Sequence, residues 1–355
     1  MAEHMLGLPV KHKFKDIKGR DHNLLTNVTA NQHHRKWAWA DEQTWSRMYH
    51  LPYACLETGW DRQNNGNPVL TPAGWEAPAG VACPTVVKCN SYYYMIYTGN
   101  AGRLNAKFGI ARSTDKITWT KSSDNPILRN DATWESYGLY YPYLVVDNKE
   151  GLYRLWYTGC QNLAPTYPFG IGYAYCPLTS DPMVRANWTK YAGNPILMNY
   201  CTMGALKLGK VVYLLTSPNM SGIDGIHMHF SKDGTTLTYF GRVMTLGSAG
   251  QWDDYSTFYS TVFWNLGIFY LIYAGRRSGV EFKLGLSLAG SDGTSYSKLF
   301  GNLGNPFFGW GASGKFDQSS VFGPSLMMEN KSFWMWYTGY YTDYRIGLAK
   351  LDLDY

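Results

Sequence analysis

The chain has 355 residues, of which 45% are hydrophobic, 16% aromatic and 16% charged, with 37 glycines and a net charge of +6. This length is enough to bury a sizeable core in one large or two ordinary domains. The mild, dispersed positive charge argues against nucleic-acid binding, and no apolar run is long enough to span a bilayer. The abundance of tyrosine and glycine favours short strands joined by tight turns.

Residues 1–58 precede the regular part of the sequence, and we predict an N-terminal extension that packs on the main domain. Within it, "KWAWADEQTWSRMY" at 36–49 has aromatic residues spaced to share one face of an amphipathic helix. The first residues lack an apolar stretch of secretory length. We therefore expect a cytoplasmic protein, or one exported without a signal peptide, for example on a virus particle. The six cysteines have no zinc or CxxC spacing and are expected to be reduced and structural.

A phrase of the form "YTG" recurs along residues 59–355. It begins at Tyr97, Tyr157, Tyr273 (as "YAG") and Tyr337, with a degenerate copy at Leu215, so successive intervals are 60, 58, 58 and 64 residues. An apolar strand precedes each copy, a loop and another strand follow it, and three units then add a "W…NP" segment. Each unit therefore predicts four antiparallel strands, here called a to d in chain order. Units of this kind are typical of propeller blades.

The two ends of the repeat predict how the ring closes. The fifth unit ends after its strand c, whereas an orphan segment, "WDRQNNGNPVL" at 60–70, precedes the first full unit. Pairing these two segments completes a blade and removes an exposed sheet edge. We predict an all-β, five-bladed β-propeller over residues 59–355, closed by an N-terminal strand that completes the C-terminal blade. The alternative is a β-sandwich with a coincidental repeat.

Acidic residues recur on the face where the b–c loops and d–a connections of such blades emerge. The sequence has four aromatic–acid pairs at a similar distance before strand a: Trp75-Glu76, Trp134-Glu135, Trp252-Asp253 and Phe316-Asp317. One interpretation is structural, because repeated units need repeated interface contacts. The other is functional, since carboxyl groups that converge near the channel would supply an acid and a base.

Other residues on this face interrupt the repeat, among them Asp224, His227, His229, Asp254, Arg276 and Arg277. A metal role for the histidines lacks a third ligand, so a hydrogen bond or a sugar contact is favoured. The two arginines suit an anionic group such as a uronate or sialate carboxylate, or simple solvation. The tyrosine-rich stretches 137–143 and 252–259 suit carbohydrate, whose C–H faces stack on rings, or packing between blades.

These features resemble the five-bladed propeller glycosidases, that is glycoside hydrolase families 43 and 32 and their relatives, over roughly residues 60–355. The resemblance rests on a proline in strand a after Cys83, Tyr141 and Gly323, on "YTG" and "IARSTD" strands, and on "W…NPIL". Members of these families have an Asp directly before the strand-a proline of the first blade, and another Asp and a Glu in later blades. This chain has no such Asp-Pro in a strand a, so the catalytic residues of the family have no counterpart by motif.

The resemblance implies a glycoside hydrolase that cleaves a poly- or oligosaccharide with a carboxylic acid and a carboxylate. The candidate catalytic residues are Glu135, Asp253, Glu76 and Asp254. The candidate substrate-binding residues are Asp224, His227, Arg276, Arg277, Arg103, Tyr141 and Asp317. We expect no required metal or cofactor, and the sequence is compatible with a structural cation in the central channel.

Two other functions are compatible with the sequence. One is a non-catalytic glycan-binding propeller, for example in a viral or cell-surface assembly. The other is a protein-interaction propeller, which would present a flat face without a pocket. The expected partner is carbohydrate, with neither nucleic acid nor membrane, and the sequence leaves the oligomeric state open.

Overall fold

The computed structural model describes residues 59–162, 166–265, 267–290, 293, 295–298 and 306–352. The chain divides into two compact units, Met1–Pro52 and Tyr53–Tyr355. The helix predicted at 36–49 lies outside the described residues. In the second unit, the described residues form five antiparallel sheets, joined by loops and short 3-10 turns.

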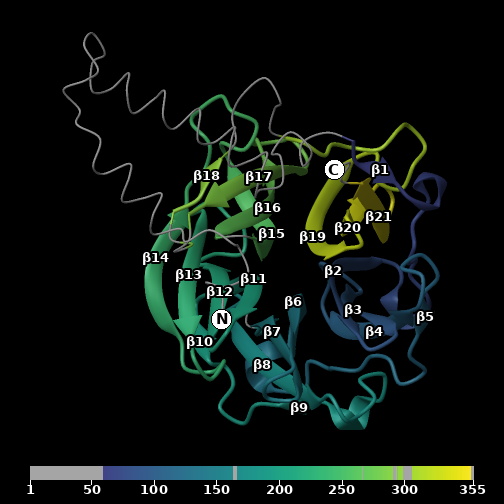
Figure 1. Ribbon diagram of the computed structural model, residues 1–355, viewed down its shortest axis with the longest axis vertical. Helices are drawn as coiled ribbons and strands as arrows, with labels where there is room; N and C mark the ends of the chain where they lie inside the picture. Colours follow the sequence, from purple (N-terminus) through teal and green to yellow (C-terminus); the bar gives the residue numbers. More distant parts are fainter. Residues whose placement is uncertain are drawn as a thin grey trace, which may run out of the picture. The chain divides into compact units, whose positions relative to one another are not determined.

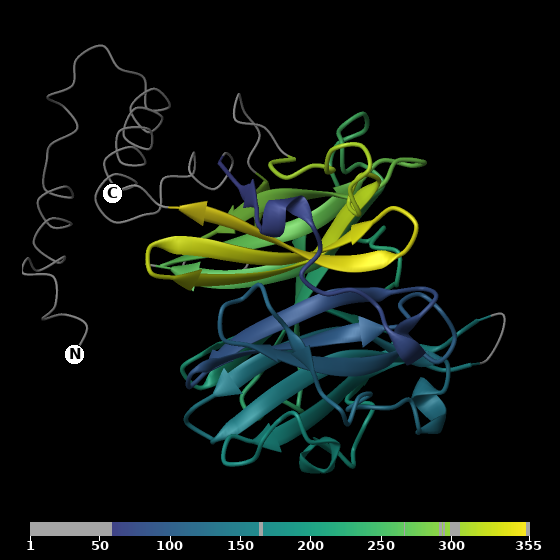
Figure 2. The same ribbon diagram turned by 90° about the vertical axis from the view of Figure 1, so that its right-hand side faces the viewer.

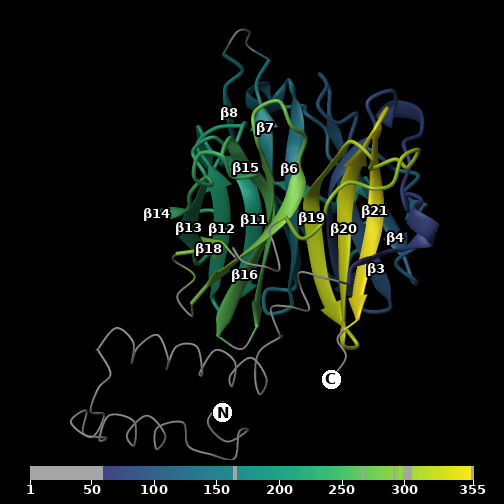
Figure 3. The ribbon, with the colours of Figure 1, turned by 90° about the horizontal axis from the view of Figure 1, so that it is seen from above.

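The five sheets are the blades of a propeller, so the predicted all-β, five-bladed fold is confirmed (Figure 1). Strands β2, β6, β11, β15 and β19 lie innermost, and each of them contacts the innermost strands of the two adjacent blades. The strand ends of the blades therefore gather at two faces (Figure 3). One of these faces carries the connections between strands b and c.

In the first four blades the strands follow one another outward in chain order. The first blade contains β2 (Val81–Cys89), β3 (Tyr92–Gly99), β4 (Lys107–Ser113) and β5 (Thr120–Lys121). The second contains β6 (Gly138–Asp147), β7 (Leu152–Cys160) and β8 (Phe169–Pro177), with β9 (Thr189–Lys190) and β10 (Leu197–Met198) both paired to β8. The third contains β11 (Cys201–Leu208), β12 (Val211–Ser217), β13 (Ile226–Ser231) and β14 (Thr238–Met244). The fourth contains β15 (Ser256–Asn265), β16 (Ile268–Arg276), β17 (Lys283–Ala289) and β18 (Ser297–Lys298).

The fifth blade takes strands from both ends of the described chain, as predicted. It contains β19 (Ser320–Glu329), β20 (Ser332–Tyr340), β21 (Tyr344–Asp352) and β1 (Asp61–Arg62). Strand β1 pairs antiparallel with β21, with Asp61 opposite Lys350, and a further bridge joins Leu70 to Ile346 (Figure 2). The 3-10 turns are η2 (Asn64–Gly66), η3 (Gly74–Glu76), η4 (Thr133–Glu135) and η5 (Arg185–Asn187).

The core lies between adjacent blades, because both faces of a blade are covered by its neighbours. Strand β3 is therefore buried at seven consecutive positions rather than alternating with polar residues. Large rings fill the wedge between blades, as do Trp156 and Trp336, both 0% exposed. Burial of such a side chain stabilises the fold by about 1.5–3 kcal/mol. The high aromatic content of the sequence is thus explained largely by packing.

The innermost strands are also joined by hydrogen bonds from one blade to the next. The backbone N–H of Leu144 donates to Thr85 Oγ1 at 2.9 Å, and that of Val86 donates to Ser325 Oγ at 2.9 Å. Buried backbone groups that face the channel have no strand partner on that side, so side-chain hydroxyls take this place. These bonds fix the channel walls, from which the site described next is built.

Candidate functional site

The innermost strands are interrupted by β-bulges beside the central channel. The pairing between the innermost strand and its neighbour shifts register once in each blade, after Ala82, Tyr140, Thr202, Phe258 and Phe322. In four blades the next residue has a positive φ: 52° at Cys83, 54° at Tyr141, 43° at Tyr259 and 59° at Gly323. This conformation is unusual for cysteine and tyrosine, and bulges commonly re-aim a side chain beside a functional site.

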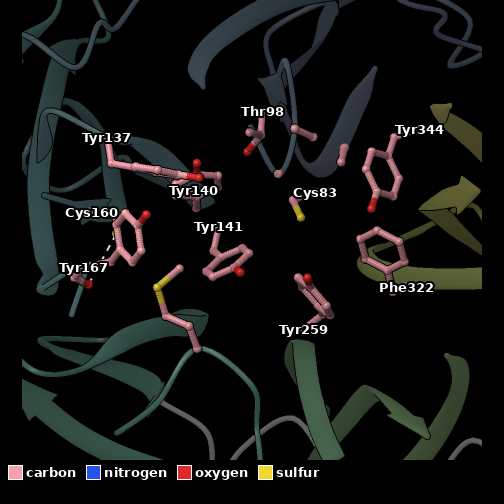
Figure 4. Close-up of a pocket in the computed structure, with 14 residues that line it drawn as sticks. Cys83, Thr98, Tyr137, Tyr140, Tyr141, Cys160, Tyr167, Tyr259, Phe322 and Tyr344 are labelled. Carbon is pink, nitrogen blue, oxygen red and sulfur yellow. Dashed lines mark hydrogen bonds between the residues drawn. The ribbon is translucent and has the colours of Figure 1, made fainter. Parts of the chain in front are cut away.

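A cavity of about 290 Å³ opens where these bulges meet the b–c loops. Cys83, Tyr141 and Tyr259 come from the bulges (Figure 4). Tyr167 comes from the loop between β7 and β8, and Tyr344 is the first residue of β21. Figure 4 shows aromatic rings around the central space on most sides. The rings that line the cavity are those of Tyr137, Tyr140, Tyr141, Tyr167, Tyr259, Phe322 and Tyr344.

The polar groups of the cavity are uncharged. The Tyr140 hydroxyl donates to the backbone carbonyl of Arg103 at 2.9 Å. The Thr98 hydroxyl is buried and has no hydrogen-bond partner within the described part of the chain. Burial raises the pKa of the Cys83 thiol far above its ordinary value, so the thiol stays protonated and is a poor nucleophile. Among the residues that the structure describes, none that lines the cavity carries a carboxyl group. The cavity therefore suits an uncharged ligand with hydroxyl groups and flat apolar faces.

The predicted catalytic residues Glu76 and Glu135 lie elsewhere, inside their own blades. Glu76 is 1% exposed and accepts hydrogen bonds from the Tyr97 hydroxyl at 2.6 Å and from Lys121. Glu135 is 0% exposed and accepts from the Tyr157 hydroxyl at 3.0 Å and from Lys190. Burial raises the pKa of Glu135, although Lys190 acts in the opposite direction.

Asp253 and Asp317 repeat this arrangement in the fourth and fifth blades, and both are fully buried. Asp253 accepts from the Tyr273 hydroxyl at 2.9 Å and from Lys298 at 2.6 Å. Asp317 accepts from the Tyr337 hydroxyl at 2.9 Å and from Arg62 Nε at 2.7 Å.

In each of these four blades, the acid thus joins a strand-b tyrosine to a cation on the outermost strand. We call this set of acid, tyrosine and cation the blade clasp. The contacts favour the structural interpretation of the recurring acids, and none of the four acids lines the cavity.

The remaining predicted acids, Asp254 and Asp224, are nearer to solvent. Asp254 accepts from the backbone N–H of Gly250 at 2.7 Å and lies 3.9 Å from Arg277 Nε. Asp224 is exposed and accepts from the Asn219 side chain at 2.5 Å. Neither of them lines the cavity, so the structure does not bring the predicted acids together around it.

The predicted histidine His227 belongs to a cluster in the third blade. Its Nδ1 lies 2.9 Å from the Tyr239 hydroxyl, and burial lowers its pKa. His229 is 2% exposed, with its Nδ1 3.2 Å from Thr216 Oγ1, and its ring centroid is 5.0 Å from that of Tyr200. Burial, together with His227, lowers the pKa of His229 to about 4. Both histidines are therefore neutral near pH 7.

The predicted arginines lie near the cavity without lining it. The Arg103 side chain is exposed, and its backbone carbonyl accepts from the Tyr140 hydroxyl, as described above. The Arg276 guanidinium lies over the Phe282 ring, with its Cζ 4.7 Å from the ring centroid. Arg277 is exposed. Tyr141 is thus the predicted site residue that does line the cavity.

Sequence reasoning missed the cavity residues that come from loops and strand ends. Met220, Phe322 and Tyr344 were not predicted, nor was Tyr167. The repeat contained a signal for Phe322 only, because this residue occupies the same place before a strand-a bulge as Tyr140. The b–c loops differ from blade to blade, so no comparable pattern in the sequence marks the other three residues.

No cluster of three or more His, Cys, Asp or Glu side chains that could hold a metal ion occurs among the described residues. Farther along the channel, a second cavity of about 230 Å³ is lined by residues that include Thr85, Ser325 and Lys207. The Lys207 ammonium is paired with Asp147 at 3.0 Å. Within the described ranges, no helix is both long and apolar enough to cross a membrane.

Comparison with models of protein families found no match, and comparison with curated proteins found none either. Among solved structures, a glycosyl hydrolase from Bacteroides ovatus is 19% identical, with a TM-score of 0.64 over 83% of this chain and 93% of its own. A β-1,2-mannobiose phosphorylase from Listeria innocua is 13% identical, with a TM-score of 0.64 over 83% and 97%. A thermostable family-43 glycoside hydrolase is 14% identical, with a TM-score of 0.62 over 79% and 91%.

The resemblance to the propeller glycosidases is therefore confirmed as a likeness of fold. These structural neighbours include both hydrolases and a phosphorylase, so the fold is compatible with more than one reaction.

Proposed function

We propose that the protein binds a carbohydrate in the cavity at the mouth of the central channel. The observation that carries this proposal is a cavity whose described lining contains seven aromatic rings and no carboxyl group. Sugar C–H faces pack on aromatic rings of this kind. The volume of about 290 Å³ is close to the lower end of the ~300–1,000 Å³ range of small-ligand pockets. It suits the end of a glycan chain better than a long internal stretch.

Binding to a glycan array by the wild-type protein and by two tyrosine variants tests this proposal. Tyr167→Ala removes an exposed ring that lines the cavity, whereas Tyr341→Ala removes a similarly exposed ring that does not. Loss of one stacking contact should weaken binding about two- to tenfold in Tyr167→Ala only. If the wild type retains no glycan, or if both variants bind like the wild type, the cavity is not a glycan site.

Hydrolysis is the second candidate function, and the fold shared with proteins named glycoside hydrolases favours it. It needs two carboxyl groups about 5–9.5 Å apart around a bound sugar. Of the predicted catalytic residues, Glu76, Glu135 and Asp253 are buried in blade clasps, and Asp254 lies away from the cavity lining.

Glycan release by the wild type, by Glu135→Gln and by Asp253→Asn separates the two candidates when unfolding is measured on the same samples. Release that a variant abolishes without loss of stability would assign catalysis to that acid. Absence of release by the wild type, together with glycan retention, would leave binding as the function. The third possibility, a protein-interaction face, predicts a flat surface and is less compatible with the cavity.

A further inference from the structure

Arg276 is held in a fixed position beside the cavity by two aromatic rings. It is the last residue of β16, at the end of the blade where the b–c loops begin. Its Cζ lies 4.7 Å from the ring centroid of Phe282 and 5.5 Å from that of Tyr255. A guanidinium placed on rings in this way keeps its planar donors aligned and loses little freedom when it binds an anion.

One ring separates this guanidinium from the cavity. The Phe282 centroid lies 5.5 Å from that of Tyr259 and 6.0 Å from that of Phe322, and both of these residues line the cavity. A sugar bound in the cavity would therefore have Arg276 within reach of the next sugar unit along the chain. Phe282 thus packs against two rings of the cavity and also carries the Arg276 guanidinium.

The charge of Arg276 is not balanced by the part of the protein that the structure describes. No carboxylate of the described residues lies within 4.0 Å of its guanidinium nitrogens, and its Nε–H is buried without an acceptor. By contrast, Arg62 and Arg154 have carboxylate partners at 2.7 and 2.8 Å. Burying part of a cation without a partner is costly, and an anionic ligand that reaches the outer nitrogens would offset this cost.

We propose that the protein recognises an acidic oligosaccharide, with one sugar unit in the cavity and the carboxylate or sulfate of a neighbouring unit on Arg276. This inference rests on the proposed function, because it takes the cavity as the site of the sugar. The fork of the guanidinium matches the paired oxygens of a carboxylate or a sulfate, and both give the same contact.

The test uses an array in which uronate-, sialate- and sulfate-bearing oligosaccharides each stand beside a neutral counterpart. The wild type should bind at least one acidic member about tenfold or more tightly than its neutral counterpart, as expected for a charge-assisted hydrogen bond. Arg276→Gln should remove this preference and keep the affinity for the neutral member. Arg277→Gln is the matched control, since it removes the adjacent, exposed arginine, and should keep the preference. The acidic group of the preferred member identifies carboxylate or sulfate as the ligand.

The outcomes separate this inference from the proposal on which it rests. Equal affinity for every acidic and neutral pair, with binding that still depends on Tyr167, overturns the role of Arg276 alone. A preference that is lost in Arg277→Gln and kept in Arg276→Gln also overturns it. Absence of binding to all members, neutral and acidic, overturns the glycan site itself.

Discussion

The third blade and the other four blades hold their outermost strands in different ways. In four blades, an acid before strand a binds a tyrosine of strand b and a cation of the outermost strand. The pairing register places the cations Lys121, Lys190, Lys298 and Arg62 opposite a small residue of strand c. In the third blade, the position that corresponds to these cations is occupied by Tyr239, which pairs with His229. An uncharged cluster of tyrosine and histidine thus replaces the clasp.

The replacement extends to the position of the clasp tyrosine. The tyrosines face a glycine of strand c, for example Tyr157 opposite Gly172, whereas Thr216 faces His227 in the third blade. The repeat places its degenerate copy at Leu215, and the pairing between β12 and β13 shifts this alignment by one residue, to Thr216. A Cβ on Gly172 would lie 2.4 Å from the Tyr157 ring, so a side chain fits there only where the tyrosine is absent.

This difference between the third blade and the others indicates that the recurring acids belong to a set of residues, the blade clasp, whose members depend on one another. A buried carboxylate without its cation would be strongly destabilising. The blade that lacks the acid also lacks the tyrosine, the glycine and the cation, as expected if the set is kept or lost together. This dependence is a property of the scaffold, and the following experiments test it.

The largest effect is expected when one clasp loses its cation. Lys298→Met leaves the fully buried Asp253 carboxylate with the Tyr273 hydroxyl as its remaining side-chain donor among the described residues, and should lower the free energy of unfolding by about 3–5 kcal/mol. Tyr239→Met, at the matching place in the third blade, should cost much less because Tyr239 is 52% exposed. Urea denaturation measures both, and equal losses would contradict the comparison.

The third blade should respond to acid in a way that the clasps do not. The pKa of His229 is about 4 in the folded protein and ordinarily about 6.5, so the unfolded chain binds the proton more readily. Its contribution to stability is therefore complete above pH 6.5 and is lost as the pH falls to 4, by about 3 kcal/mol. The variant His229→Ala should show a flatter profile of stability against pH between pH 7 and 4. Alanine is the residue at the matching position of the first blade, Ala111. Parallel profiles for wild type and variant would show that His229 is not the titrating group.

A side chain added at the glycine position should be harmful only in blades with a clasp. Gly172→Ala forces its methyl group against the buried Tyr157 ring and should cost about 1–3 kcal/mol. His227→Ala places the same residue at the matching position of the third blade and should stay near or below the lower limit of that range. Thermal unfolding of both variants measures this, and an unaffected Gly172→Ala would mean that the ring has room to move.

The smallest effect is expected for the hydroxyl of the third-blade cluster. Tyr239→Phe removes the 2.9 Å contact to His227 Nδ1 and keeps the ring. Because Tyr239 is half exposed, water replaces part of this contact, and the cost should be at most about 1 kcal/mol. A loss as large as that for Lys298→Met would mean that the cluster is as tightly coupled as a clasp.

The sequence was sufficient for the fold because the repeat is regular. Its period set the number of blades, and the orphan segment at 60–70 correctly indicated that β1 completes the last blade. The clasp cations also had a signal, an aromatic residue two positions earlier, as in Trp119 before Lys121 and Trp188 before Lys190. Their role did not follow from it, because the partner acid lies 45 or 55 positions away and only the folded blade brings the two together.

The candidate site was less predictable for a physical reason. Its residues come from several blades and from loops that share no repeat, so no spacing in the sequence links Tyr167 to Tyr344. Acids were the conspicuous chemical signal, yet most of them are used inside the blades. The bulges that turn Cys83 and Tyr259 toward the cavity depend on backbone conformation, which the sequence indicates only where a proline follows.

The pairing of β1 with β21 also has a consequence for synthesis on the ribosome. Arg62 and Ala349 pair although they are 287 positions apart, so β1 is made long before its partner strand exists. At about 5–20 residues per second, the nascent chain carries this unpaired segment for roughly 15–60 s. During that time the first four blades can form, and the ring closes last. A growing chain therefore offers an open sheet edge to any neighbour on the same messenger RNA until its final strand emerges.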